Sequence, residues 1–266
     1  MEIIPLGTNG FFPSFGRETA CYIIPYRKVL IILDAGSGLF RLAEPEGQRI
    51  LNKASEIHLF LSHYHLDHTF GFYAAFRLFA KKKVSVFAPD ERKVFSELPP
   101  LKYFPIDYRE KHKNFRWISL ASGGHKISSY KVMVKRQKHR EEISLAFRFE
   151  FVSSNKISLV YLTDQEPSKK MADFSRDASI LLHEHWLAGR KTAMGKKEPE
   201  YEKEIVDGHI TSVGAAMLAK EAKVKKLVLV HHHPLLDNQQ LKRQLGYAKS
   251  IFGNSALGCD LKQLQF

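Results

Sequence analysis

The chain has 266 residues, 44% of them hydrophobic and 12% aromatic, which is enough apolar material for a sizeable core and excludes a disordered composition. Lys and Arg number 41 against 28 Asp and Glu, so the formal net charge is +13. That charge attracts phosphates or nucleic acid, and it also favours solubility. The two cysteines, Cys21 and Cys259, exclude a disulfide framework and a cysteine-based zinc site. Without an apolar run of about 18 residues or a secretory leader, we expect a cytoplasmic protein with no membrane partner.

Strand patterns dominate the first half of the chain. They cover residues 2–7, 19–25, 28–36, 57–63 and 84–89. The third of these runs ends in Asp34 and a glycine turn, which is typical of a buried strand whose carboxyl end faces a site. A helix is expected over residues 69–82, because Phe72, Phe76 and Phe79 recur at helical spacing. Residues 96–117 are rich in proline and aromatic side chains, which predicts an irregular covering segment.

The second half of the chain repeats this organisation. Strands are expected at residues 131–137, 143–151, 156–164, 178–186 and 226–230, and helices at 211–222 and 239–251. Thr211 is placed to cap the first of these helices. Polar side chains follow strands in both halves, which favours one α/β sandwich domain over residues 1–266 with its site along one edge of the sheets.

The densest group of polar side chains is the block SHYHLDH, which directly follows an apolar strand. In an extended strand end, residues two apart face the same side, so His63 and His65 point together. Asp67 and His68 follow where the chain turns into a helix. The block therefore predicts two neighbouring metal pockets, one containing His63 and His65 and the other containing Asp67 and His68.

Three further side chains complete the set of candidate ligands. Asp164 and His231 come directly after apolar strands, and His139 follows a basic, partly apolar one. Imidazole and carboxylate ligands without thiolate suit zinc, manganese or iron. Asp164 lies between the two groups and is able to bridge two metal ions ~3.5–4 Å apart.

These motifs resemble those of the metallo-β-lactamase superfamily over nearly the whole chain. SHYHLDH matches that family's H-x-H-x-D-H motif, and IILDAGSG matches its first motif, in which Asp34 orients the site without binding metal. His139 is similar to the third motif, Asp164 to the fourth and His231 to the last. The resemblance implies an α/β fold, a four-layer αββα sandwich of two facing mixed sheets with outer helices.

The resemblance also implies a dinuclear centre whose bridging hydroxide attacks the substrate. Two divalent ions are expected, zinc first and manganese or iron as alternatives. One ion is held by His63, His65 and His139, the other by Asp67, His68 and His231, with Asp164 between them. Asp67 is also placed to orient the hydroxide or to take its proton.

Two further blocks resemble phosphodiesterases of the RNase Z type. HEHW aligns Glu184 with the glutamate of their H-E-A-T block, and GHITS aligns His209 with the histidine of their H-S-T block. In those enzymes this pair is thought to serve the leaving alkoxide, so Glu184 and His209 join Asp67 as expected catalytic residues. Ile210 and the pair His185-Trp186 depart from those blocks, which affects the details of substrate contact.

The sequence favours a dinuclear metal-dependent hydrolase, a phosphodiesterase that acts on a cyclic nucleotide or another short nucleotide. RNase Z enzymes that process tRNA precursors generally carry a long arm between the third and fourth motifs. Here only 25 positions separate His139 from Asp164, and two strands fill them. The basic run 131–140 is expected to draw in the phosphate, and Tyr103 or Phe104 to stack on a base.

Three alternatives stay open. The first is an RNase Z-like endonuclease that processes the 3′ end of tRNA, with RNA as its partner. The second is a glyoxalase II-type hydrolase of thioesters or lactones, because those enzymes share the metal core. The third is a non-hydrolytic member that binds nucleic acid or carries out redox chemistry. A homodimer is compatible with each of them.

Overall fold

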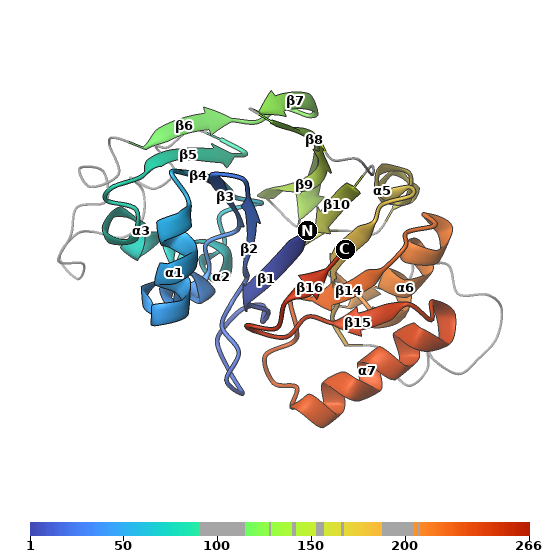
Figure 1. Cartoon of the computed structure of the whole chain (residues 1–266). Coiled ribbons are helices and arrows are strands. Elements are labelled where there is room, and N and C mark those ends of the chain that lie inside the picture. The colour runs from blue at the N-terminus through green and yellow to red at the C-terminus, as the bar shows by residue number, and fades with distance from the viewer. Residues whose placement is uncertain are drawn as a thin grey trace.

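A computed structural model of the chain describes residues 1–90, 115–127, 129–139, 142–152, 157–165, 168–187, 205–206 and 208–266. Two seven-stranded sheets face each other, and helices cover their outer surfaces (Figure 1). The prediction of a four-layer αββα sandwich is confirmed. Among the helices that the structure describes, none is both long enough and apolar enough to cross a lipid bilayer.

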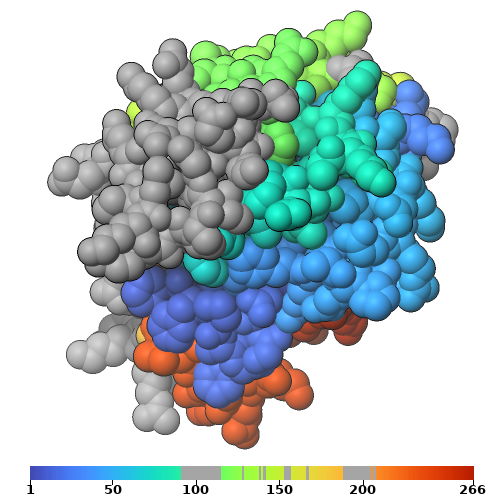
Figure 2. Space-filling view, turned by 90° about the vertical axis from the view of Figure 1, so that its left-hand side faces the viewer, coloured from blue at the N-terminus to red at the C-terminus, as the bar shows by residue number. Residues whose placement is uncertain are grey.

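The first sheet has the strand order β16-β1-β2-β3-β4-β5-β6. Its strands are β1 (Glu2–Gly7), β2 (Cys21–Tyr26), β3 (Val29–Leu33), β4 (Glu56–Phe60), β5 (Lys83–Ala88), β6 (Arg116–Ser119) and β16 (Leu264–Gln265). Strands β3 to β6 are parallel, so their carboxyl ends share one edge of the sheet. Its outer face carries η1 (Ser37–Ala43), α1 (Pro45–Lys53), α2 (Leu66–Thr69) and α3 (Phe72–Leu78). The light-blue to teal surface of Figure 2 includes helices α1 and α3.

The second sheet has the strand order β15-β14-β11-β10-β9-β8-β7. Its strands are β7 (Gly123–Ile127), β8 (Tyr130–His139), β9 (Glu142–Phe151), β10 (Ile157–Leu162), β11 (Ile180–Glu184), β14 (Leu227–Val230) and β15 (Ser255–Leu257). Strands β10, β11, β14 and β15 are parallel. Its outer face carries α5 (Lys169–Ser175), α6 (Ser212–Glu221) and α7 (Asn238–Ile251). A separate pair, β12 (Ile205–Val206) and β13 (His209–Ile210), precedes α6.

The strands are apolar on both faces because both faces are covered. In β3, Ile31 and Leu33 face the opposite sheet, whereas Leu30 and Ile32 face the helices. This alternation follows from the two-residue repeat of a strand. Three buried layers result, one between the sheets and one under the helices on each side.

The expected strands are all present within a few residues, and so are the two expected C-terminal helices. Thr211 caps α6 by accepting a hydrogen bond from the Gly214 amide at 3.1 Å. The expected irregular segment is partly wrong, since Arg116–Ser119 forms strand β6 beside β5. Tyr103 and Phe104 lie outside the described residues.

The expected helix over residues 69–82 is also wrong in its limits. The chain forms the short helix α2 from Leu66 and, after a break at Gly71, α3 to Leu78. A Cβ at Gly71 would lie 2.1 Å from the Gly36 carbonyl oxygen, so the backbone passes too close to the loop after β3 for any side chain. The Ala35 amide donates to the His68 carbonyl at 2.8 Å and ties the same two segments together. Tertiary packing, and not periodicity, sets these helix limits.

Phe60 on β4 joins the two sheets, because its ring stacks on Phe87 at 4.6 Å and meets Phe147 and Phe149 of the other sheet edge-on. Replacing Phe60 with Ala should destabilise the fold by about 3–5 kcal/mol, since the cavity cannot close between two sheets. Urea unfolding followed by circular dichroism measures this change. Phe15→Ala, at an exposed position, is the control and should cost at most about 1 kcal/mol. Equal losses in the two variants would contradict the proposed role of Phe60.

Candidate metal centre

The site lies where strands of both sheets end at the same edge. Asp34 follows β3, Asp164 follows β10 and His231 follows β14. All three adopt left-handed backbone conformations, with φ of 56°, 46° and 54°. Asp and His tolerate this region better than β-branched residues, which lets the chain leave each strand sharply and turn the side chain into the edge.

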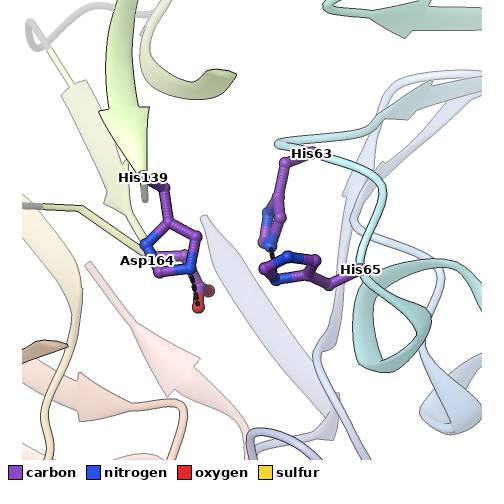
Figure 3. A group of neighbouring side chains, drawn as sticks. All are labelled: His63, His65, His139 and Asp164. Carbon is purple, nitrogen blue, oxygen red and sulfur yellow. Dashed lines mark hydrogen bonds and ion pairs between the residues drawn. The ribbon is translucent and has the colours of Figure 1, made fainter. Parts of the chain in front are cut away.

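One group of donors consists of His63, His65, His139 and Asp164, whose ligand atoms all lie within 4.8 Å of one another. His63 and His65 come from the loop after β4 and approach His139 and Asp164 from the opposite side (Figure 3). His63 Nε2 lies 3.0 Å from His65 Nδ1, as expected for side chains that point together. His139 Nε2 lies 3.7 Å from Asp164 Oδ1.

The second group contains Asp67, His68 and His231. His231 Nε2 lies 3.2 Å from Asp67 Oδ2 and 3.3 Å from Asp164 Oδ2, and His68 Nε2 lies 3.0 Å from Asp164 Oδ2. Asp164 therefore turns one carboxylate oxygen to each group. The two pockets inferred from the sequence are present as clusters, and Asp164 stands between them.

The protonation states of several donor side chains, with neutral imidazoles and ionised carboxylates among them, favour the binding of cations. Burial lowers the pKa of His63 and of His139, so both imidazoles are neutral at neutral pH. Burial alone would raise the pKa of Asp164, but His231 and His68 outweigh it and hold the pKa of that carboxyl well below its usual range. The Asp67 carboxyl behaves in the same way, since the effect of burial on its pKa is outweighed by His68 and His231.

Hydrogen bonds leave the correct nitrogens free for metal. Asp34 accepts from His68 Nδ1 at 2.8 Å, so Nε2 is the His68 nitrogen that faces the other donors. The Ser62 hydroxyl donates to Asp34 at 2.9 Å and therefore accepts from His63 Nδ1 at 3.0 Å, which leaves the lone pair of His63 on Nε2. The buried His68 Nε2 has no hydrogen-bond partner among the described residues. Such a nitrogen aimed at a carboxylate fits a shared cation, so the donor set fits divalent metal ions.

Asp34 does not belong to either donor group. It is fully buried, and besides His68 and the Ser62 hydroxyl it accepts the Ser62 amide at 2.7 Å and the Tyr161 hydroxyl at 2.6 Å. Tyr161 lies on β10 of the other sheet, so this hydrogen bond crosses the sandwich. The geometry agrees with an orienting aspartate. Ser62 and Tyr161 were not predicted, although both lie within three residues of a predicted ligand.

Glu184 and His209 form a pair beside the donor groups. His209 Nδ1 lies 2.6 Å from Glu184 Oε2, and the Gln165 amide donates to Glu184 Oε1 at 2.8 Å. The Trp186 ring stacks on His209 with centroids 4.5 Å apart. Glu184 and His209 also lie within 4.8 Å of ligand atoms of Asp164 and His231. Their shortest contact is with each other, from His209 Nδ1 to Glu184 Oε2.

The other histidines of these motifs lie behind the site. His183 is buried, which lowers its pKa to about 4, and it belongs to no donor group among the described residues. His185 Nε2 lies 2.7 Å from His232 Nδ1, and His232 Nε2 donates to the Gly258 carbonyl at 2.8 Å. These buried contacts support the strand end that carries His231.

A cavity of about 520 Å³ opens over the donor groups. It is lined by His65, Asp67, His139, Asp164, Trp186, His209 and His231, together with Phe11 and Leu66. Phe11 and Leu66 were not predicted, because each belongs to a stretch that reads as an ordinary loop or helix start.

Part of the basic run 131–140, which is expected to draw in the phosphate, is held by backbone contacts, and the side chains of Lys138 and Arg140 lie outside the described part of the chain. Arg136 donates to the carbonyls of Pro89 and Leu120 at 2.9 and 3.2 Å, and Lys135 donates to the Lys170 carbonyl at 3.0 Å. Neither side chain lines the cavity. Lys135 and Arg136 instead bind backbone carbonyls of neighbouring segments.

Comparison with known proteins agrees with this site. Residues 29–232 match the family model described as "Beta-lactamase superfamily domain". The chain belongs to this superfamily. Ribonuclease Z of Archaeoglobus fulgidus is 22% identical over 312 aligned positions, which cover 99% of this chain and 97% of the relative. Ribonuclease Z of Clostridium kluyveri is 23% identical over 318 positions, which cover 100% and 99%.

Solved structures show the same fold. The metallo-β-lactamase fold protein YhfI of Bacillus subtilis superposes with a TM-score of 0.73 at 18% identity, covering 99% of this chain and 98% of that one. The short form of human tRNase Z superposes with a TM-score of 0.67 at 18% identity, covering 100% and 99%. The prediction of a metallo-β-lactamase superfamily hydrolase, similar to RNase Z, is confirmed.

The geometry predicts the metal content of the purified protein. The protein should bind about two equivalents of a divalent metal, and Asp164→Ala should lower the occupancy of both positions because Asp164 faces both groups. Inductively coupled plasma mass spectrometry after dialysis measures the content. His125→Ala, whose imidazole lies 2.9 Å from the Ala121 carbonyl and away from the donor groups, should leave it unchanged. Full metal content in His139→Ala would show that His139 is not a ligand.

Proposed function

We propose that this hydrolase is a phosphodiesterase that acts on a small phosphodiester such as a cyclic nucleotide or a short nucleotide. The observation that carries the proposal is the Glu184–His209 pair, in which His209 lines the metal cavity and the buried Glu184 holds it from behind. The donor groups alone suit several hydrolytic reactions of this superfamily. An alkoxide leaves more readily when it receives a proton. An imidazole that a buried carboxylate fixes beside the donor groups is placed to give that proton.

In this proposal, His63, His65, His139 and Asp164 hold one ion, and Asp67, His68 and His231, with the other oxygen of Asp164, hold the second. When bound, two divalent ions supply Lewis-acid stabilisation of the phosphoryl oxygens and activation of water. Asp67 is further placed to orient the attacking water, because its carboxylate lines the cavity.

His209 serves the leaving group in this proposal. Its Nδ1 donates to Glu184 at 2.6 Å, so this proposal assigns the other nitrogen, Nε2, to the leaving group. Glu184 and the Trp186 ring together fix the plane of the imidazole. Nε2, when protonated, gives its proton to the oxygen that departs from phosphorus.

The chain between the third and fourth motifs supports a small substrate. Strand β9 begins three residues after His139, and β10 ends two residues before Asp164. The two strands pair directly, with Phe151 opposite Ile157. Only residues 140–141 and 153–156 of this interval lie outside the described ranges, too few for a long arm.

A second candidate is endonucleolytic processing of tRNA precursors. It is favoured by the relatives, which are named Ribonuclease Z and match this chain over almost its full length, and by the net charge of +13. The alignment with the Archaeoglobus relative spans 312 positions, however, whereas this chain has 266 residues. The relative therefore contains segments that this chain lacks, which favours the smaller substrate.

The role of His209 predicts a dependence on the leaving group. His209→Ala should lower kcat by ~10²–10⁴ for an alkyl or ribose leaving group, which needs a proton, and much less for p-nitrophenolate. Steady-state rates on both substrates measure the difference, with His125→Ala as the control. Equal losses on the two substrates would remove the acid role.

A comparison of the two candidate substrates decides between the two proposals. The kcat/KM values for 2′,3′- and 3′,5′-cyclic nucleotides are compared with cleavage of a tRNA precursor at the same salt concentration, since RNA binding depends on salt. We expect turnover of a cyclic nucleotide. Accurate cutting at the 3′ end of the precursor with negligible cyclic nucleotide turnover would overturn the choice.

A further inference from the structure

Two large apolar side chains stand exposed at the metal cavity. Phe11 is 72% exposed and Leu66 is 64% exposed, and both line the cavity. Leu66 follows the donor His65 directly, and Phe11 comes from the loop after β1. The Phe11 ring contacts the neighbouring Phe12 ring, with centroids 5.3 Å apart, and both Phe11 and Leu66 present apolar surface to a ligand in the cavity.

The backbone holds Phe11 firmly at this position. Its amide donates to Asp67 Oδ2 at 2.7 Å, and its φ of 62° lies in the left-handed region, which is costly for a phenylalanine. The preceding Gly10 packs on the His231 ring, where a Cβ would lie 2.3 Å from the ring carbon Cε1. The main chain of Phe11 is thus fixed by two side chains of the second donor group, and its ring is left on the outside.

Further contacts anchor the loop that carries Phe11. The buried Arg17 donates to Asn9 Oδ1 at 2.6 Å and to the Leu236 carbonyl at 2.6 Å. This arginine connects the loop to the segment before α7. Figure 2 shows the dark-blue N-terminal part of the chain exposed beside the orange C-terminal part. A strained backbone on an anchored loop that presents an exposed aromatic ring is a prepared binding surface.

The cavity therefore has two chemically different parts. Its floor consists of imidazoles and carboxylates suited to cations and a phosphoryl group, and its rim consists of Phe11 and Leu66. Trp186 is buried and already stacked on His209, so its ring serves that histidine. A substrate that uses both parts carries a flat apolar group close to its phosphodiester.

We propose that Phe11, together with Leu66, forms a nucleobase subsite in which the base of the substrate stacks on the Phe11 ring. The inference rests on the proposed phosphodiesterase function and names the substrate class more closely as a nucleoside phosphodiester. Stacking of a base on an aromatic side chain tolerates every base, so this subsite gives preference for nucleotides over simple phosphodiesters without strong sequence preference.

The test compares two substrates with the same leaving group. Thymidine 5′-(p-nitrophenyl phosphate) carries a base, and methyl p-nitrophenyl phosphate does not. In Phe11→Ala, the ratio of kcat/KM for the thymidine ester to that for the methyl ester should fall by about 5- to 150-fold, which corresponds to the loss of one stacked base. The loss should lie mainly in KM, because the ring contacts the base and not the reacting atoms. An unchanged ratio would overturn the subsite.

Phe15→Ala is the matched control. Phe15 belongs to the same loop, has a positive φ of 50° and is 56% exposed, but it does not line the cavity and its ring lies over Arg17. The ratio should stay at the wild-type value in this variant. An equal fall in Phe15→Ala and Phe11→Ala would show a general effect of the loop and overturn the subsite.

A binding measurement separates this inference from the proposed function. In Phe11→Trp, titration with thymidine 5′-monophosphate should quench the added indole fluorescence relative to the wild-type protein. Ribose 5-phosphate, which has no base, should not quench it. If the wild-type protein hydrolyses neither ester, the phosphodiesterase proposal fails, and the fluorescence decides the subsite alone. Absence of quenching, or equal quenching by both phosphates, would overturn the subsite.

Discussion

The buried carboxylate of Asp34 is the interaction on which the rest of this site depends. It accepts hydrogen bonds from the Ser62 amide and hydroxyl, from His68 and from Tyr161, at 2.6 to 2.9 Å. A buried carboxylate is tolerated only when such donors surround it. Through His68 it fixes a ligand of one donor group, and through the Ser62 hydroxyl it fixes His63 in the other. One side chain therefore orients an imidazole in each of the two donor groups.

Asp34 also explains why the site needs two sheets. The Tyr161 hydroxyl reaches it from β10 across the sandwich, and residue 164, three positions later, turns into the cavity with a positive φ. The apolar layer between the sheets, with Phe60 at its centre, holds the two strand ends in register. A change in sheet spacing would move Asp164 relative to His63, so packing far from the metals controls their geometry.

The sequence predicted the elements that carry their own local pattern. Alternating apolar strands and the H-x-H-x-D-H block predicted the fold and the candidate donors that the structure brings together, because strand periodicity and ligand spacing are local. The helix break at Gly71 and the hydrogen bond from Tyr161 to Asp34 were not predictable, since partners separated by 35 or 127 positions meet only through packing. Phe11 was missed for another reason: an exposed ring in a loop has meaning only once the cavity beside it is known.

The most direct test of this account is a zinc titration of metal-stripped protein by isothermal calorimetry, comparing the wild type with Asp34→Asn. The substitution keeps the size of the side chain. It replaces one of the two acceptor oxygens with an NH₂ group, which is itself a donor and cannot accept the hydrogen bonds that reach this position. If Asp34 orients ligands of both groups, zinc affinity should fall by about 10- to 100-fold at both positions, with the fold retained by circular dichroism. Unchanged affinity, or a loss confined to one position, would contradict the central role of Asp34.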